Sequence, residues 1–284
     1  MTTLTASTLT ASTLGAPDDD LATVLSWLAL AGVPGVELRV APGQIAHAGM
    51  AADECADVRA TLADAGIRLT GLASYIKLCR NASDGSVIGE LADVLKLASQ
   101  LGAPVVRVFP GAPVHSAPYG IRPRLREPEA DVTARAIRRL DAVAHLSEDL
   151  GSHPALETHD SHPRAADIVP ILERASGPVG AVWDLMHPWR TGEQLKQTWE
   201  LLAPWLADGR GSVQVKDANL PTDAMPLPIG DGTLPVDEFA QLLIDHGYDG
   251  VVCLEWEKAW YPSAPDLPVG LDSAVRWFDR HWRS

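Results

Sequence analysis

Short runs of apolar, often β-branched residues alternate along the chain with longer segments in which apolar residues recur at helical spacing. The apolar runs predict eight strands, at residues 10–15, 35–40, 68–74, 104–109, 154–159, 179–185, 212–217 and 251–256. The amphipathic segments predict helices at residues 18–32, 51–65, 85–101, 129–150, 164–175, 192–206, 235–246 and 269–282. Several of these segments end in glycine, which is typical of a helix C-cap.

Strands that alternate with helices over about 250 residues are typical of a closed (β/α)₈ barrel. An open, doubly wound sheet is the alternative, but no G-x-G-x-x-G follows the first predicted strand and no G-x-x-x-x-G-K-[ST] occurs. We therefore predict an α/β fold with a single TIM barrel over residues 10–284, preceded by a flexible extension over residues 1–9. Residues 111–129, rich in proline, are expected to form a long loop after the fourth strand.

Charge and cysteine content narrow the choice of partners. Lys and Arg total 23 against 37 Asp and Glu, and the net charge of −14 disfavours nucleic acid as a partner. Three cysteines without C-x-x-C spacing predict neither disulfides nor a thiolate zinc site, so a reducing cytoplasm is the expected location. No apolar run is long enough to cross a bilayer, which predicts no membrane partner. Trp277 and Trp282 would suit a contact in a homo-oligomer, although they could equally pack against the barrel.

Carboxylates stand at the ends of three predicted strands. The carboxyl ends of barrel strands meet at one face, so Glu157, Asp184 and Glu255 should lie around one axis, with Gln214 of the seventh strand beside them. Burying unpaired carboxylates is costly, and a divalent cation would compensate them. The oxygen-rich set favours Mn²⁺ or Mg²⁺, with Co²⁺ as a further alternative.

Other polar residues near strand ends have ordinary explanations as well as functional ones. His187 follows Asp184 by three residues and could face the same pocket, whereas His159 alone could be a loop or packing residue. Arg107 could be a structural ion-pair partner of Glu37. Lys216, with Asp217, could form a solvated strand end. Lys77 and Arg190, like Arg107, could bind a phosphate or carboxylate if their loops point inward.

Seven segments, taken in their order and spacing, carry a family resemblance. The chain over about residues 10–280 resembles the xylose-isomerase-like barrel superfamily of sugar isomerases and epimerases, with hydroxypyruvate-isomerase-like and ketose 3-epimerase-like members. The ligand set and the net charge do not suit the endonuclease branch of that superfamily. The segments are VELR (36–39), VRVFPG (106–111), ALETH (155–159), VWDLMHP (182–188), VQVKDA (213–218), IGDGTLPVDEF (229–239) and YDGVVCLEWE (248–257).

The resemblance implies a ligand set and catalytic roles. It implies that Glu157, Asp184, the residue at position 214 and Glu255 bind the metal, that Glu157 and Glu255 also exchange protons with the substrate, and that His187 and Glu37 contact the sugar. Many members carry His where Gln214 stands here, and hydroxypyruvate-isomerase-like members carry Gln, so the change bears on metal affinity and preference.

The sequence therefore predicts a divalent-metal-dependent isomerase or epimerase, with Mn²⁺ as the first choice of metal. The substrate is expected to be a small sugar or sugar derivative without a phosphate group, contacted also by Arg107, His159 and Lys216. Proton removal next to a carbonyl, through an enediolate, would be the chemistry. A metal-dependent lyase on a sugar derivative is the alternative, and a barrel that binds a sugar without turnover is a third possibility.

Overall fold

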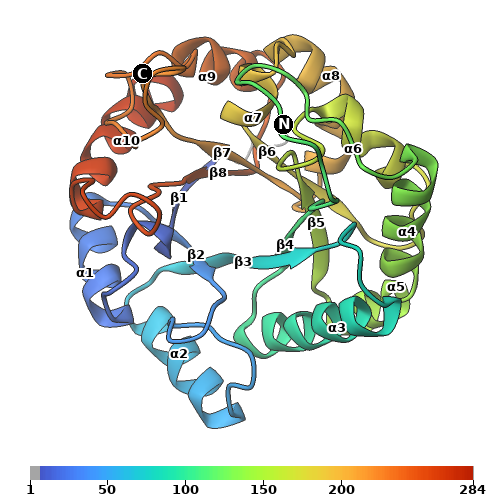
Figure 1. The fold of residues 1–284 in the computed structure, drawn as a ribbon. Helices are drawn as coiled ribbons and strands as arrows, with labels where there is room; N and C mark the ends of the chain where they lie inside the picture. The colour runs from blue at the N-terminus through green and yellow to red at the C-terminus, as the bar shows by residue number, and fades with distance from the viewer. Residues whose placement is uncertain (1–6, 284) are drawn as a thin grey trace.

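Eight parallel strands close into a barrel in sequence order, in a computed structural model that describes residues 7–283. Each strand pairs with the next, and β8 pairs with β1 (Figure 1). This arrangement confirms the predicted single (β/α)₈ barrel. The strands are β1 (Thr8–Ser12), β2 (Gly35–Arg39), β3 (Arg68–Lys77), β4 (Val105–Phe109), β5 (His153–Glu157), β6 (Gly180–Asp184), β7 (Ser212–Val215) and β8 (Val251–Leu254).

Helices surround the barrel on all sides (Figure 1). The segment predicted as one helix over 129–150 is divided into two helices, α4 and α5. Two short elements, η1 and α7, were not predicted. The helices are η1 (Thr13–Gly15), α1 (Leu21–Ala31), α2 (Ala52–Asp64), α3 (Asp84–Leu101), α4 (Glu129–Asp141), α5 (Ala144–Leu150), α6 (Ala165–Leu172), α7 (Met186–Arg190), α8 (Leu195–Leu206), α9 (Val236–Asp245) and α10 (Leu267–Trp282).

The first strand begins earlier than the pattern indicated. β1 starts at Thr8 and pairs with β8 from there, so residues 8 and 9 belong to the barrel rather than to an extension. Residues 1–6 of the predicted extension lie outside the described residues. Among residues 7–283, no helix has the length and apolar character of a membrane span.

The main apolar core lies between the strands and the surrounding helices, and a small apolar cluster lies apart from it. Val105, Ala155 and Val182 form this cluster inside the barrel. Side chains alternate along a strand, so residues paired across β4, β5 and β6 point to the same side of the sheet. Closer to the carboxyl ends of the strands than this small cluster, the interior positions carry charged and amide groups. The polar residues therefore lie toward the carboxyl ends of the strands.

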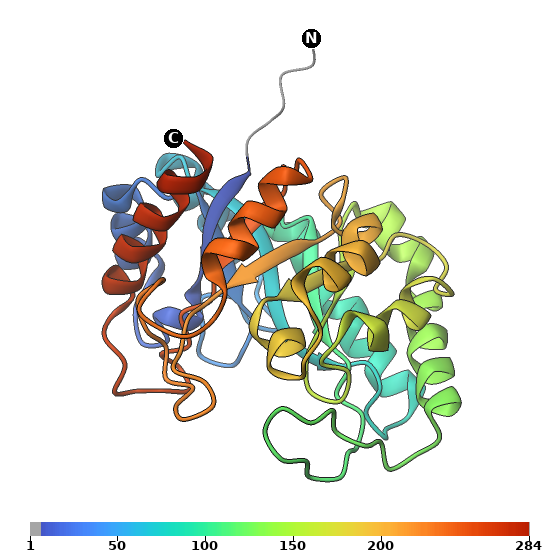
Figure 2. The same cartoon turned by 90° about the horizontal axis from the view of Figure 1, so that it is seen from above.

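Long loops cover that end of the barrel. The loop between β4 and α4 projects farthest (Figure 2, green), and residues 111–129 are indeed mostly loop. The loop after β7 is held by Asp217, whose buried carboxylate accepts backbone hydrogen bonds from Ala218, Gly230, Gly232 and Leu234. The interpretation of Lys216 and Asp217 as a solvated strand end is therefore wrong, because both side chains are buried.

The backbone of Gly180, the first residue of β6, lies very close to the backbone of Arg210, and this contact can be used to test the packing of the barrel. A Cβ atom on Gly180 would lie 1.5 Å from the carbonyl oxygen of Arg210, so we expect Gly180→Ala to lower the free energy of unfolding by at least about 2 kcal/mol. Gly89 of α3 has open space around it, and Gly89→Ala should instead stabilise by up to about 1 kcal/mol. Urea unfolding measures both changes, and similar effects for the two variants would contradict the packing.

Candidate active site

The predicted site residues come together because they stand on consecutive strands of a closed barrel. Glu157 and Asp184 are the last residues of β5 and β6, Gln214 lies in β7, and Glu255 directly follows β8. Asp184 and Gln214 are paired across β6 and β7, so both point into the barrel. All four side chains are buried.

Arg107 of β4 lies between two of these carboxylates. Its guanidinium contacts Glu255, with Nη1 2.9 Å from Oε1, and Glu157, with Nε 3.3 Å from Oε2. The carbonyl oxygen of Ser74 accepts a further hydrogen bond from Arg107 Nη2 at 3.3 Å. From the sequence, Glu37 was considered as the ion-pair partner of Arg107. In the structure Arg107 forms its ion pairs with Glu157 and Glu255 instead.

Lys216 supplies the second buried cation. Its ammonium lies 2.8 Å from Asp184 Oδ2 and 2.8 Å from Glu257 Oε1, and it also contacts Glu255. Glu257 was not among the predicted site residues. Its spacing of two residues from Glu255 was the available signal, since extended chain places alternate side chains on one side.

Charge in this cluster is only partly compensated. Four carboxylates, those of Glu157, Asp184, Glu255 and Glu257, contact two cations, Arg107 and Lys216. Burial raises the pKa of Glu157 and of Asp184 above their usual values. Burial also acts on Glu255, but Lys216 and Arg107 outweigh it and lower its pKa to about 2. The cluster therefore has the electrostatic capacity to accept further positive charge.

Gln214 carries an unused ligand atom. Its amide nitrogen lies 3.4 Å from Glu255 Oε1, whereas its buried oxygen Oε1 makes no hydrogen bond with any residue from 7 to 283. A buried amide oxygen without a partner is costly, and a cation or a substrate hydroxyl would satisfy it. Its chemistry and its neighbours fit a hard divalent cation.

Two histidines stand beside the carboxylates. His187 lies in α7, whose backbone nitrogens at Met186 and His187 donate to Asp184 Oδ1 at 2.6 and 3.3 Å. The ring of His159 stacks on Phe109 at 4.2 Å and meets the ring of His187 edge-on at 4.3 Å. Burial lowers the pKa of His187 well below its usual value, so its imidazole is neutral and able to accept.

Glu157, His159 and His187 also form a second possible donor set. One donor atom of each lies within 4.8 Å of the others, the one such trio of titratable groups found among residues 7–283. His159 is set in this place by a tight turn in which its backbone pairs with His162 and Asp160 adopts φ of 48°. Glu157 is therefore common to the set predicted from the sequence and to this trio.

Glu37 lies deeper than the other predicted substrate contacts. It is buried in β2 and lines, with Arg107, a cavity of about 620 Å³ whose rim residues, among them Thr8 and Asp249, lie at the amino-terminal end of the barrel. Burial raises the pKa of its carboxyl group. The structure thus places Glu37 below the carboxylate cluster rather than at its open side.

An aromatic wall, formed by Tyr75, Phe109, His159 and Trp260, borders the site at Arg107, and of its members only His159 was among the predicted site residues. Ring centroids are 5.8 Å apart for Trp260 and Tyr75 and 6.0 Å apart for Tyr75 and Phe109. The guanidinium of Arg39 lies beside Tyr75 and Trp260, 5.3 Å from the Tyr75 ring centroid and 5.1 Å from that of Trp260. The wall encloses one side of the polar cluster.

Comparison with known proteins identifies the family of the chain. The model of the xylose isomerase-like TIM barrel family matches residues 25–281, and the chain belongs to that family. A protein of Streptomyces coelicolor (strain ATCC BAA-471 / A3(2) / M145), named "Putative hydroxypyruvate isomerase", is 28% identical over 234 residues, which cover 76% of this chain and 80% of that protein.

Solved structures share the whole barrel at low identity. D-psicose 3-epimerase with D-tagatose from Clostridium cellulolyticum H10 has a TM-score of 0.72 at 15% identity, covering 97% of this chain and 99% of that chain. A structure named IOLI protein, with a zinc atom bound, has a TM-score of 0.75 at 15% identity, covering 98% and 100%. At this identity the likeness establishes the fold.

The double contact of Lys216 generates a stability prediction. Lys216→Met removes the ammonium from Asp184 and Glu255 and should lower the free energy of unfolding of the metal-free protein by about 3–5 kcal/mol. Lys96→Met, at an exposed pair with Asp93, should change it by less than about 1 kcal/mol. Urea unfolding in the presence of a chelator measures both.

The same variant should change the dependence of stability on pH. Without Lys216, the pKa values of Asp184 and Glu255 rise in the folded state and are unchanged in the unfolded state. As the pH increases, the unfolded state therefore releases its protons at a lower pH than the folded state does. The free energy of unfolding of the variant then falls as the pH rises. The loss should be larger near about pH 8 than near about pH 5. An unchanged or opposite slope would show that Lys216 does not compensate these carboxylates.

Proposed function

We propose that the protein is an enzyme that moves a proton next to the carbonyl group of a sugar or related hydroxy-carbonyl compound, as a divalent-metal-dependent isomerase or epimerase. The observation that carries this proposal is the pair Glu157 and Glu255, two buried carboxylates that share one guanidinium. General acid–base catalysis needs two such groups within reach of one substrate. Family membership and the hydroxypyruvate isomerase relative support an isomerase as the reaction type.

Glu157 and Glu255 are assigned the proton transfers. One removes the proton from the carbon next to the carbonyl, and the other delivers a proton to the neighbouring carbon or to the opposite face. Arg107 holds both carboxylates and fixes their separation, since it contacts Glu157 and Glu255 at once. The neutral His187 is assigned to a substrate hydroxyl, which it would orient as an acceptor. Lys216 would donate to a substrate oxygen in exchange for one of its three carboxylate contacts.

Glu157, Asp184, Gln214 and Glu255 would hold the cation. Their fit rests on the free amide oxygen of Gln214 and on the carboxylates that Arg107 and Lys216 leave without counter-charge. A bound divalent cation supplies Lewis-acid polarisation of the carbonyl and stabilises enediolate charge. We propose Mn²⁺ as the metal, because an amide and three carboxylates offer oxygen only.

Deuterium exchange tests the proton transfer. With a panel of ketoses in D₂O and Mn²⁺ present, we expect proton NMR to show deuterium entering next to the carbonyl, and Glu255→Gln to slow this at least about 100-fold. Glu200→Gln, at an exposed carboxylate of α8, is the matched control and should exchange at the rate of the unaltered protein. Undiminished exchange by Glu255→Gln would refute the assignment, and loss of mass from the substrate would replace the isomerase with a lyase.

Metal affinity separates the two possible donor sets. Gln214→Leu should weaken Mn²⁺ binding, measured by calorimetry, at least about tenfold, because it removes a ligand oxygen of the proposed set. His159→Leu should leave the affinity unchanged within about twofold. The opposite result would assign the metal to Glu157, His159 and His187 instead.

A further inference from the structure

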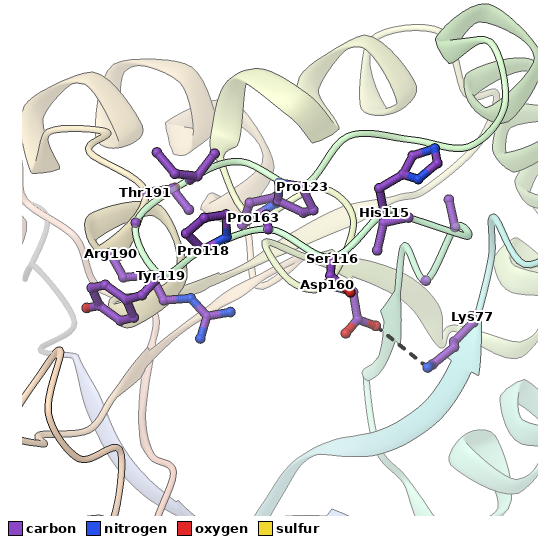
Figure 3. Close-up of a pocket in the computed structure, with 16 residues that line it drawn as sticks. Lys77, His115, Ser116, Pro118, Tyr119, Pro123, Asp160, Pro163, Arg190 and Thr191 are labelled. Atoms are coloured by element: carbon purple, nitrogen blue, oxygen red, sulfur yellow. Dashed lines mark ion pairs between the residues drawn. The ribbon is translucent and has the colours of Figure 1, made fainter.

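A second pocket adjoins the carboxylate cluster at the mouth of the barrel. It has a volume of about 460 Å³ and is formed by the loop after β4, the end of β3, the turn after β5 and the end of α7. Figure 3 shows Lys77, Asp160 and Arg190 along the pocket, on three different elements, with Asp160 between the two cations. The volume is in the range of pockets that hold small molecules.

The charge inside this pocket is positive, although the chain as a whole is strongly negative. Lys77 and Arg190 face a single carboxylate, Asp160. That carboxylate lies 3.9 Å from Lys77 Nζ but only 3.0 Å from His159 Nδ1. No hydrogen bond or ion pair of the Arg190 guanidinium is found among the residues that the structure describes. A guanidinium in a concave site without a counter-ion is suited to a carboxylate or a phosphate.

The backbone determines where the stems of both cations begin. Gly111 has a left-handed φ of 58°, and a Cβ atom there would lie 2.4–2.6 Å from the side-chain carbons of Lys77. The glycine therefore allows the stem of Lys77 to lie directly against the loop after β4. Arg190 follows His187 by three residues in α7, a spacing that places both side chains on one face of the helix.

The pocket is linked to the proposed catalytic residues through the neighbours of its lining residues, although none of the catalytic residues lines it. Asp160 is the neighbour of His159, and the charge of Arg190 acts on both Asp160 and His187. His159 and His187 in turn have donor atoms within 4.8 Å of Glu157. A substrate held at the carboxylates would therefore have to extend past His159 and His187 to meet the cations.

We propose that the substrate is anionic: it carries a carboxylate or a phosphate ester, bound in the pocket that Lys77 and Arg190 line, at the end remote from the carbon that exchanges its proton. This inference rests on the proposed function and adds the charge of the substrate to it. A substrate with a carboxylate agrees with the expectation from the sequence of a sugar derivative without phosphate. A substrate with a phosphate ester contradicts that expectation.

Calorimetry with three unreactive six-carbon polyols tests the proposal. Sorbitol is neutral, D-gluconate carries a carboxylate, and sorbitol 6-phosphate carries a phosphate. We expect at least one of the two anions to bind about tenfold or more tighter than sorbitol, the effect of a charge-assisted hydrogen bond. Tighter binding of D-gluconate would identify the group as a carboxylate, and tighter binding of sorbitol 6-phosphate would identify it as a phosphate.

Variants connect the preference to the two cations. The double substitution Lys77→Met and Arg190→Met should remove the preference for the anion while leaving sorbitol binding unchanged. Asp160→Asn, which removes the competing carboxylate and tolerates a left-handed φ, should strengthen anion binding about twofold or more. Lys96→Met, at an exposed cation of α3, is the control and should leave all three affinities unchanged.

The outcomes distinguish this inference from the proposed function. Equal binding of all three polyols, absence of binding by both anions, or a preference that survives the double substitution would overturn the anionic subsite. Deuterium exchange on neutral ketoses would still support the proposed chemistry in those cases. Conversely, a preference that depends on Lys77 and Arg190, in a protein that exchanges no deuterium with any ketose or keto acid, would sustain the subsite and remove the isomerase.

Discussion

Desolvation of carboxylates inside the barrel is the constraint on which this site depends. Glu157, Asp184 and Glu255 are buried at the ends of three strands, where water cannot stabilise their charge. Arg107 and Lys216 offset part of the cost by contacting them at 2.8–3.3 Å or closer. The balance is incomplete, since the cations are outnumbered. Buried carboxylates without counter-charge lower the stability of the fold. A bound cation or substrate would supply the missing partners, which gives these carboxylates a functional reason to be buried in the barrel.

Different parts of the barrel support the fold and carry the proposed chemistry. Below the cluster, Val105, Ala155 and Val182 form a small apolar layer inside the barrel, and glycines such as Gly180 permit close approach of neighbouring backbones. Above it, loops are tied down by buried polar groups, as Asp217 does for the loop after β7. Rigid strands thus hold the proposed acid–base pair, while the loops determine what else a substrate meets. The cationic pocket around Lys77 and Arg190 belongs to this second layer.

The two resident cations have different geometric consequences. The planar guanidinium of Arg107 reaches Glu157 and Glu255 from one side and sets the distance between them. The ammonium of Lys216 is a compact charge that contacts Asp184, Glu255 and Glu257 together. Glu257 provides Lys216 with a partner outside the proposed ligand set. The ion pair with Glu257 therefore gives the lysine an anchor that does not depend on the metal ligands.

The sequence by itself determined the order of strands and helices, because apolar runs of period two and amphipathic segments of period 3.6 reflect local burial. It also determined that Glu157, Asp184, Gln214 and Glu255 would meet, since closure of parallel strands in sequence order leaves their ends no other arrangement. The break between α4 and α5, the short helix α7 and the start of β1 at Thr8 were decided by tertiary packing.

Side-chain partnerships were also decided by the tertiary structure alone. Arg107 pairs with glutamates 50 and 148 positions away in the sequence, and one pocket is lined by Lys77 at the end of β3, Asp160 in the turn after β5 and Arg190 at the end of α7. Sequence periodicity reports which face of an element is buried. The choice of a partner across the barrel depends on distances between elements, which exist only once the chain has closed.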